Sequence, residues 1–254
     1  MNASRCLFAV IFFVLGVHIE GSGQSTAAQT ARATNLLTQM SSQSFSAAST
    51  QQMMLMPPDR TSKLDGNPYW DEHWGTSSVL LYDNPKPNDG YLTRYDIRRD
   101  ELEFNINGQV KVAQGKLVKN VVWIDSVTRK SRFLVNARDY KLDGVPLIGF
   151  IEILVEGEPA LVKKTNLEVL QPNYNVALST GNQNSRIVKE NAFFYTTNNE
   201  LFEITSKKKI EPLFGNDTEQ MNKFIKEERL RTSRQDDLIR IFTQLASLRA
   251  KSPK

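Results

Sequence analysis

The residues Phe193-Phe-Tyr-Thr-Thr-Asn-Asn-Glu-Leu-Phe-Glu-Ile204 hold two short runs of strand-forming side chains around the pair Asn198-Asn199. A two-residue hairpin loop requires positive φ angles, which Asn tolerates better than most residues. With this pair as the loop, Tyr195 lies opposite Phe202. Because cross-strand pairs of this kind stabilise antiparallel sheets, the stretch predicts a β-hairpin.

A second hairpin is expected around the turn signal Asn107-Gly108. The preceding run, 101–106, alternates polar and apolar residues, which is typical of a half-buried strand. A three-residue loop places Phe104 opposite Val112, whereas a two-residue loop places Phe104 opposite Lys111. A shift of one residue turns every side chain to the other face, so we expect the three-residue loop, which matches apolar with apolar.

Short apolar runs bounded by turn residues continue through the middle of the chain. The expected strands are 78–83, 91–98, 110–112, 118–127, 132–136, 147–155 and 160–164. The polar stretch 171–188 is expected to be a loop. Tight turns without intervening helices predict a mainly β fold over residues 65–205, an antiparallel barrel-like or sandwich domain.

The last part of the chain, 206–254, has the spacing of amphipathic helices. One apolar set belongs to a first helix and another to a second, with a short connection between them; these sets are Met221, Phe224 and Ile225, and Leu238, Ile241, Phe242, Leu245 and Leu248. We expect a C-terminal α-helical hairpin packed on the β domain.

Positive charge is concentrated in this helical part. It holds 12 Lys and Arg against 7 Asp and Glu, while the net charge of the whole chain is +4. Lys207, Lys208 and Lys209, together with the basic helices, are therefore a candidate site for an anionic polymer or membrane surface. Mixed charge is normal on exposed helix faces, so a solvated surface is the favoured interpretation.

The first residues predict export. A charged start with Arg5 precedes the apolar run 6–19, and Gly21-Ser22-Gly23 follows it, as in a secretory signal peptide over residues 1–23. The run would form a helix of about 21 Å, which is short against a hydrocarbon layer of about 30 Å. Residues 24–64, rich in Gln, Ser and Met, are expected to be a flexible tether. The expected location is periplasmic or extracellular, with membrane association only transient, through the signal peptide.

The inventory of reactive side chains is small in an otherwise ordinary globular composition of 40% hydrophobic and 24% charged residues. Cys6 is the only cysteine, and His18 and His73 are the only histidines. Cleavage would remove Cys6 and His18, which leaves no nucleophilic thiol and little acid–base or metal chemistry. We therefore expect no catalytic residues, no metal site and no cofactor. Paired carboxylates, the machinery of many glycoside hydrolases, stay open because their pairing is spatial.

The densest cluster of large side chains opens the β domain. The segment Asn67-Pro-Tyr-Trp-Asp-Glu-His-Trp-Gly75 offers Tyr69, Trp70, His73 and Trp74 as a candidate platform for a sugar or peptide, since such rings combine an apolar face with a polar edge. The favoured alternative is that these rings are buried under the edge of the sheet.

Four stretches together resemble a known family: Asn67-Pro-Tyr-Trp-Asp-Glu-His-Trp-Gly75, Leu92-Thr-Arg-Tyr-Asp-Ile-Arg-Arg-Asp-Glu-Leu-Glu-Phe104, Gly149-Phe-Ile-Glu-Ile-Leu-Val-Glu-Gly157 and Asp236-Asp-Leu-Ile-Arg-Ile-Phe242. From about residue 67 to 248 the chain is similar to uncharacterised exported β-rich proteins of Bacteroidetes-type Gram-negative bacteria. The resemblance implies fold and export. It implies no activity, because the motifs are descriptive and not catalytic.

The functional expectation is an exported non-enzymatic binding or scaffolding protein of the cell envelope. Its partner would be an envelope protein or a glycan. Nucleic acid is not expected, because an exported protein meets little of it. The alternatives are a carbohydrate-active hydrolase with paired carboxylates, a binder of anionic polymers or membrane surfaces through the basic helices, and a sensor of a small apolar ligand inside a barrel.

Overall fold

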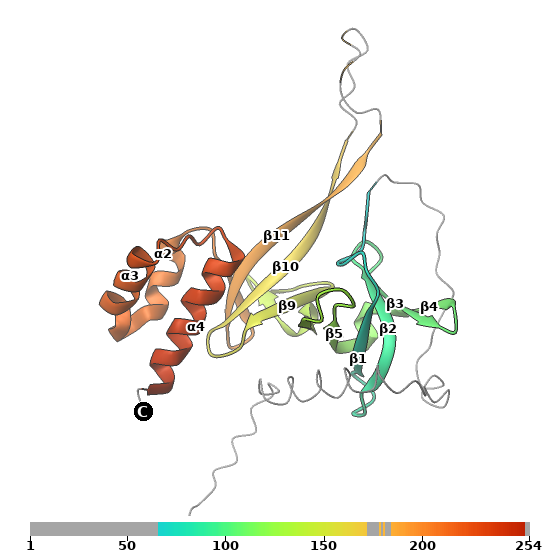
Figure 1. Ribbon diagram of the computed structural model, residues 1–254, viewed down its shortest axis with the longest axis horizontal. Helices are drawn as coiled ribbons and strands as arrows, with labels where there is room; N and C mark the ends of the chain where they lie inside the picture. Colours follow the sequence, from blue (N-terminus) through green and yellow to red (C-terminus); the bar gives the residue numbers. More distant parts are fainter. Residues whose placement is uncertain (1–65, 172–177, 179, 181–183, 252–254) are drawn as a thin grey trace, which may run out of the picture.

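The computed structural model describes residues 66–171, 178, 180 and 184–251 (Figure 1). The predicted signal peptide, 1–23, and the predicted tether, 24–64, lie outside the described residues. No helix in the described ranges is both long and apolar enough to cross a membrane.

Twelve strands form one sheet, in the order β4-β3-β2-β1-β5-β6-β9-β10-β11-β12-β7-β8. Their bounds are β1 Gly75–Leu81, β2 Asn88–Asp96, β3 Glu101–Ile106, β4 Gln109–Gln114, β5 Val118–Ile124, β6 Ser131–Asn136, β7 Lys141–Leu142, β8 Val145–Pro146, β9 Phe150–Val155, β10 Ala160–Leu170, β11 Arg186–Thr197 and β12 Glu200–Glu203. Neighbours run antiparallel except β12 and β7, which are parallel. The mainly β, antiparallel prediction is confirmed. The sheet is not closed, so of the two predicted arrangements the sandwich-like one fits.

The β11–β12 hairpin has the predicted register. Tyr195 lies opposite Phe202, and the two rings stack with centroids 4.9 Å apart. Asn198 and Asn199 both adopt positive φ angles, 53° and 62°. The paired asparagines therefore form the two-residue loop that the sequence predicts.

The predicted register of the β3–β4 hairpin is wrong. Phe104 lies opposite Lys111, across a two-residue loop in which Asn107 and Gly108 have φ angles of 52° and 80°. The prediction assumed that only one face of β3 is buried. Both faces are, because Glu103 is 3% exposed beside Phe104 at 0%. Alternation then carries no information on the register, and the turn residues decide it.

The C-terminal helices form the expected hairpin. They are α2 Lys207–Ile210, α3 Thr218–Glu227 and α4 Gln235–Lys251, and the 3₁₀ helix η4 Glu211–Asp217 joins the first two. Leu238 and Ile241 of α4 are fully buried and share one core with Met221 of α3 and Leu161 of β10. Figure 1 shows the helices gathered at one end of the sheet, beside β10 and β11.

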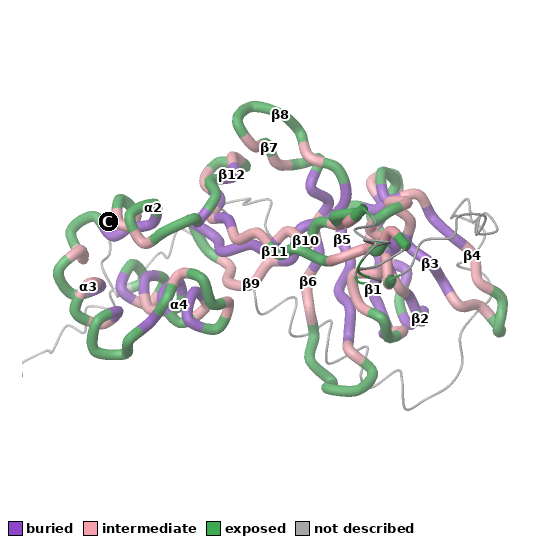
Figure 2. The backbone as a smooth tube through the Cα atoms, turned by 90° about the horizontal axis from the view of Figure 1, so that it is seen from above, coloured by how far each residue is buried: buried purple, intermediate pink, exposed green. Residues whose placement is uncertain are grey.

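A second core lies in the first half of the sheet, around Phe104, Val121 and Trp123. Two further 3₁₀ helices, η2 Gly115–Leu117 and η3 Ala137–Asp139, follow β4 and β6. Buried residues are frequent in β2 and β5 and at the Ala160 end of β10. Figure 2 shows that β7 and β8, by contrast, are mostly exposed.

Strands β10 and β11 form a long two-stranded ribbon, paired from Ala160 opposite Thr196 to Leu170 opposite Arg186. The ribbon rises away from the rest of the sheet (Figure 1). The sequence predictions for this region are wrong in extent: β10 runs past residue 164, and 186–188 of the expected loop are strand. The far half of the ribbon has no buried residue, and its apolar alternation on β10 is limited to Leu167 and Val169, which is too short to mark a strand by itself.

Candidate functional site

The aromatic segment that the sequence singles out lies along the end of β2. The Trp70 amide donates to the Tyr95 carbonyl at 2.9 Å, and the Ile97 amide donates to the Pro68 carbonyl at 3.0 Å. The segment thereby continues the sheet beyond β1. Its rings are half-buried against the sheet and not displayed on a separate loop.

Arginine side chains cover the faces of these rings. The Arg94 guanidinium lies 3.4 Å from the Tyr69 ring centroid and 4.6 Å from that of Trp74. The Arg132 guanidinium lies 3.5 Å from the centroid of the Trp70 ring. Cation–π contacts of this kind occupy the surfaces that a sugar would use for stacking.

Of the four residues predicted for the platform, only His73 is largely exposed. Its side chain is 62% exposed, and Nδ1 lies 3.2 Å from Oδ1 of Asp71. Trp70 packs edge-on against Trp123, with centroids 5.4 Å apart. The segment thus brings Tyr69, Trp70 and Trp74 together as part of the packing, with His73 at its outer side.

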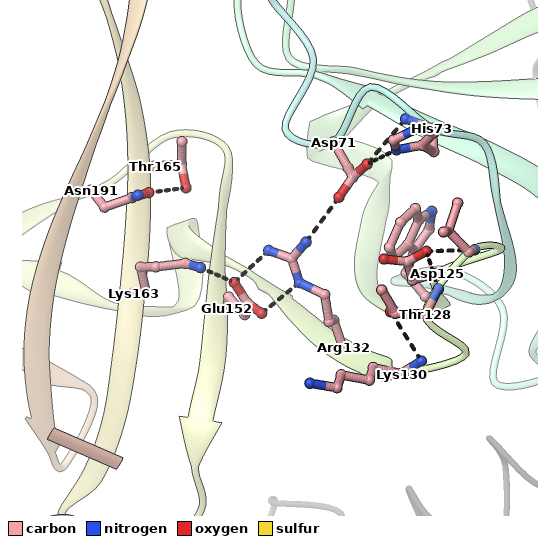
Figure 3. A network of polar contacts seen from close by, with 12 residues as sticks. Asp71, His73, Asp125, Thr128, Lys130, Arg132, Glu152, Lys163, Thr165 and Asn191 are labelled. Atoms are coloured by element: carbon pink, nitrogen blue, oxygen red, sulfur yellow. Dashed lines mark hydrogen bonds and ion pairs between the residues drawn. The ribbon is translucent and has the colours of Figure 1, made fainter. Parts of the chain in front are cut away.

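A chain of ion pairs connects the aromatic segment to β6, β9 and β10 (Figure 3). A hydrogen bond extends this chain to α4. Arg132 of β6 donates from NH1 to Asp71 at 3.1 Å and from Nε and NH2 to Glu152 of β9, at 2.7 and 2.9 Å. Lys163 of β10 lies 2.6 Å from Glu152 and donates to Gln235 of α4 at 3.1 Å. Burial favours the protonated form of Glu152, but Arg132 and Lys163 outweigh it and hold its pKa below the ordinary value.

The other buried acids also accept hydrogen bonds from protein groups. Glu103 accepts from Arg94 at 2.8 Å and from the Tyr69 hydroxyl at 3.0 Å. Asp96 accepts from Arg99 at 3.1 Å, and Asp237 accepts from the Arg231 amide at 3.0 Å. These carboxylates stabilise turns and strand contacts, and none of them lines either of the two clefts described below.

The basic residues of the helical part lie far along the molecule from the aromatic segment (Figure 1). Lys207 pairs with Glu211 at 3.7 Å, and Lys208 and Lys209 are exposed. Further basic residues of this region are paired with acids: Lys223 with Glu227, Arg234 with Asp237 and Arg240 with Glu228. The positive charge is therefore partly neutralised locally. Within the described ranges, no group of three His, Cys, Asp or Glu is placed to hold a metal ion.

One cleft, of about 360 Å³, lies between the sheet and α4. Arg132 reaches it from β6 and Ile239 and Thr243 reach it from α4. Three Arg132 donors are already engaged by Asp71 and Glu152, and Glu156, the other charged residue lining this cleft, also has a partner, so the cleft offers little free charge to a ligand.

Another cleft, of about 340 Å³, opens where β9 and β10 part, and sequence reasoning missed it. β10 pairs with β9 only over Leu161, Val162 and Lys163, whereas β11 continues along its other side to Leu170. From 164 to 170, one edge of β10 therefore has no strand partner in the described part of the chain. This edge forms one wall of the cleft.

The opposite wall is the segment that leads into β9. The Gly149 carbonyl accepts from the Ala137 amide at 2.8 Å, so its hydrogen bonding is directed toward β6 and away from β10. A Cβ atom on Gly149 would lie 2.7 Å from the Tyr95 hydroxyl, which explains the glycine at this close approach. Ile148 is 77% exposed on the cleft, although it is a large aliphatic residue.

Lys164 bridges the two walls. Its Nζ donates to the Ile148 carbonyl at 2.8 Å. Burial lowers the pKa of this ammonium group, and the charge of Asp100 works in the opposite direction. The remaining lining mixes apolar side chains, among them Ile97, Leu167, Val169 and Ile187, with the polar residues Arg98, Thr165 and Asn166. The nearest sequence signal is the continuation of the 160–164 strand through 165–170, which gives no sign of a free edge.

The fold and this cleft define a class: a mainly β protein with an open sheet, a projecting ribbon and a C-terminal helical hairpin. No family model, curated protein or solved structure matches the chain.

Proposed function

We propose that this is an exported, non-enzymatic binding protein that takes up an extended peptide segment of a partner as an added strand on β10. Export is supported by the charged start, the apolar run and the small residues of the N-terminal sequence. The non-enzymatic character is supported by the engagement of the buried acids with Arg, Lys or backbone amides.

The free edge of β10 carries the proposal. A strand edge presents backbone N–H and C=O groups that a further strand can satisfy, and proteins use this in peptide recognition. The edge here is seven residues long, 164–170, and faces a cleft with exposed aliphatic side chains. Backbone hydrogen bonds would supply affinity, and the aliphatic side chains would select apolar residues in the added strand.

Selection from a phage-displayed library of short random peptides, with the purified full chain as bait, tests this function. The selected peptides should show apolar residues at alternate positions and should bind the purified protein in solution. Ile148→Asp should weaken this binding about tenfold or more, because it places an unpaired charge in the apolar wall.

Val127→Asp is the matched control, since Val127 is 68% exposed in the β5–β6 turn, away from the cleft. It should leave peptide binding unchanged. Loss of binding in both variants, or in neither, would place the peptide elsewhere and contradict strand addition at β10.

A further inference from the structure

We infer that the peptide taken up on β10 carries a carboxylate side chain, which pairs with Lys164, next to apolar residues that contact the cleft walls. This inference rests on the proposed function and names the chemistry of its partner. It is carried by the surroundings of Lys164 and by the side-chain alternation of β10.

Lys164 has hydrogen-bond donors left for an anion. An ammonium group has three donors, and the structure shows one of them used, on the Ile148 carbonyl at 2.8 Å. Among the described residues no carboxylate lies within ion-pair distance of its Nζ. The neighbouring Lys163, by contrast, is 2.6 Å from Glu152. The two consecutive lysines therefore differ: Lys163 is paired with Glu152 inside the sheet, whereas Lys164 lines the cleft, with the charge of Asp100 beyond ion-pair distance.

The partly desolvated position of Lys164 makes such a pair effective. Water screens exposed ion pairs strongly, whereas a half-buried cation beside aliphatic side chains interacts more strongly with an incoming anion. A neutral residue at the same place would leave the ammonium group with fewer partners. The cleft thus discriminates by charge as well as by shape.

The pleat of β10 predicts the spacing in the peptide. Side chains alternate between the two faces of a strand, so Leu167 and Val169 share one face and Lys164 belongs to the other. A strand added beside β10 follows the same pleat. Its carboxylate should therefore stand an odd number of residues from the apolar residues that meet Leu167 and Val169.

Two synthetic peptides test the inference: a short alternation of valine and threonine in which one central threonine is replaced by glutamate, and its twin with glutamine there. The glutamate peptide should bind the unmodified protein about tenfold more tightly, the usual size of a charge-assisted hydrogen bond. Lys164→Met should abolish this preference while it leaves binding of the glutamine peptide nearly unchanged. Lys119→Met, a control at an exposed position of β5, should retain the preference.

The outcomes separate the inference from the function. Binding of neither peptide contradicts strand addition itself. Equal binding of both peptides, or a preference that survives Lys164→Met, overturns the inference and leaves strand addition standing. If decanoate binds in a Lys164-dependent way and neither peptide binds, the cleft takes a free carboxylate and both ideas are wrong. Thermal unfolding of each variant shows that it is folded.

Discussion

The guanidinium group of Arg132 donates two hydrogen bonds, of 2.7 and 2.9 Å, to the carboxylate of Glu152 and thereby links β6 to β9. Glu152 is 5% exposed and the Arg132 side chain is 24% exposed, so the carboxylate of this pair is buried and the guanidinium is partly buried. Lys163 approaches the same carboxylate, and Asp71 accepts the third donor of Arg132. The network fixes β6, β9 and β10 together just before β9 and β10 part.

Removal of Arg132 should therefore be costly. In Arg132→Met the buried Glu152 keeps only Lys163 as a cationic partner. Loss of one member of a fully buried pair costs about 3–5 kcal/mol, and because Lys163 remains we expect a smaller loss, about 1–3 kcal/mol. Urea unfolding followed by tryptophan fluorescence measures the change. Lys223→Met, at the exposed pair with Glu227, is the control and should change the free energy of unfolding little. Equal changes in the free energy of unfolding for the two variants would contradict the conclusion that the Arg132 network holds β6, β9 and β10 together.

Acid should weaken the fold partly through Glu152. Its pKa is below the ordinary value of 4.5 in the folded protein, so the unfolded chain binds a proton more readily. The stability that this group contributes is complete above its ordinary pKa and is lost as the pH falls through the folded pKa. Urea unfolding at a series of pH values should show a shallower acid decline for Glu152→Gln than for the unmodified protein. Parallel declines would exclude Glu152 as a contributor.

Gly149 and Gly108 have nearly equal φ angles but different surroundings, so their alanine variants can distinguish the cost of backbone strain from the cost of a steric clash. Gly149 has φ +84° and would place a Cβ 2.7 Å from the Tyr95 hydroxyl, whereas Gly108 has φ +80° and open space around it. Each alanine variant should cost about 1–2 kcal/mol from backbone strain. Gly149→Ala should cost more than Gly108→Ala, because Tyr95 must also move. The reverse order in chemical denaturation would contradict the close packing at the cleft.

The hydroxyl of Tyr69 should matter for stability. It donates to Glu103, which is almost fully buried, at 3.0 Å, and loss of a hydrogen bond to a charged group costs about 1.5–3 kcal/mol. Tyr82→Phe is the matched control, because Tyr82 donates at 2.7 Å to Asp139, an exposed acid. Thermal unfolding should show the larger loss for Tyr69→Phe. A larger loss for Tyr82→Phe would mean that the aromatic segment contributes little to the fold.

The sequence predicts this fold well where turn residues and one-sided burial agree. Asn198-Asn199 and the apolar residues beside it determine their hairpin, and the helical spacing of Leu238 and Ile241 identifies α4. The sequence prediction fails for the register of the β3–β4 hairpin at Phe104, because burial on both faces of β3 removes the alternation that would indicate the register. The Asp143-Gly144 turn between β7 and β8 follows a known hairpin signal but joins strands of only two residues each, too short to show any alternation.

The candidate site is harder to predict than the fold. The rings of Tyr69 and Trp70 draw attention in the sequence, yet only the folded structure shows Arg94 and Arg132 on their faces. Lys164 stands beside Lys163 in a polar stretch and looks like an ordinary surface residue. Its special position arises because β9 leaves β10 at that point, a long-range event that no local pattern records.

Backbone amide exchange along β10 tests the proposal most directly. With a selected peptide bound, the amides of 164–170 that point away from β11 should exchange more slowly than in the free protein, because each gains a hydrogen-bond partner from the added strand. Amides of β4, the edge at the far end of the sheet, should be unaffected. Tight peptide binding without added protection along 164–170 would contradict strand addition on β10.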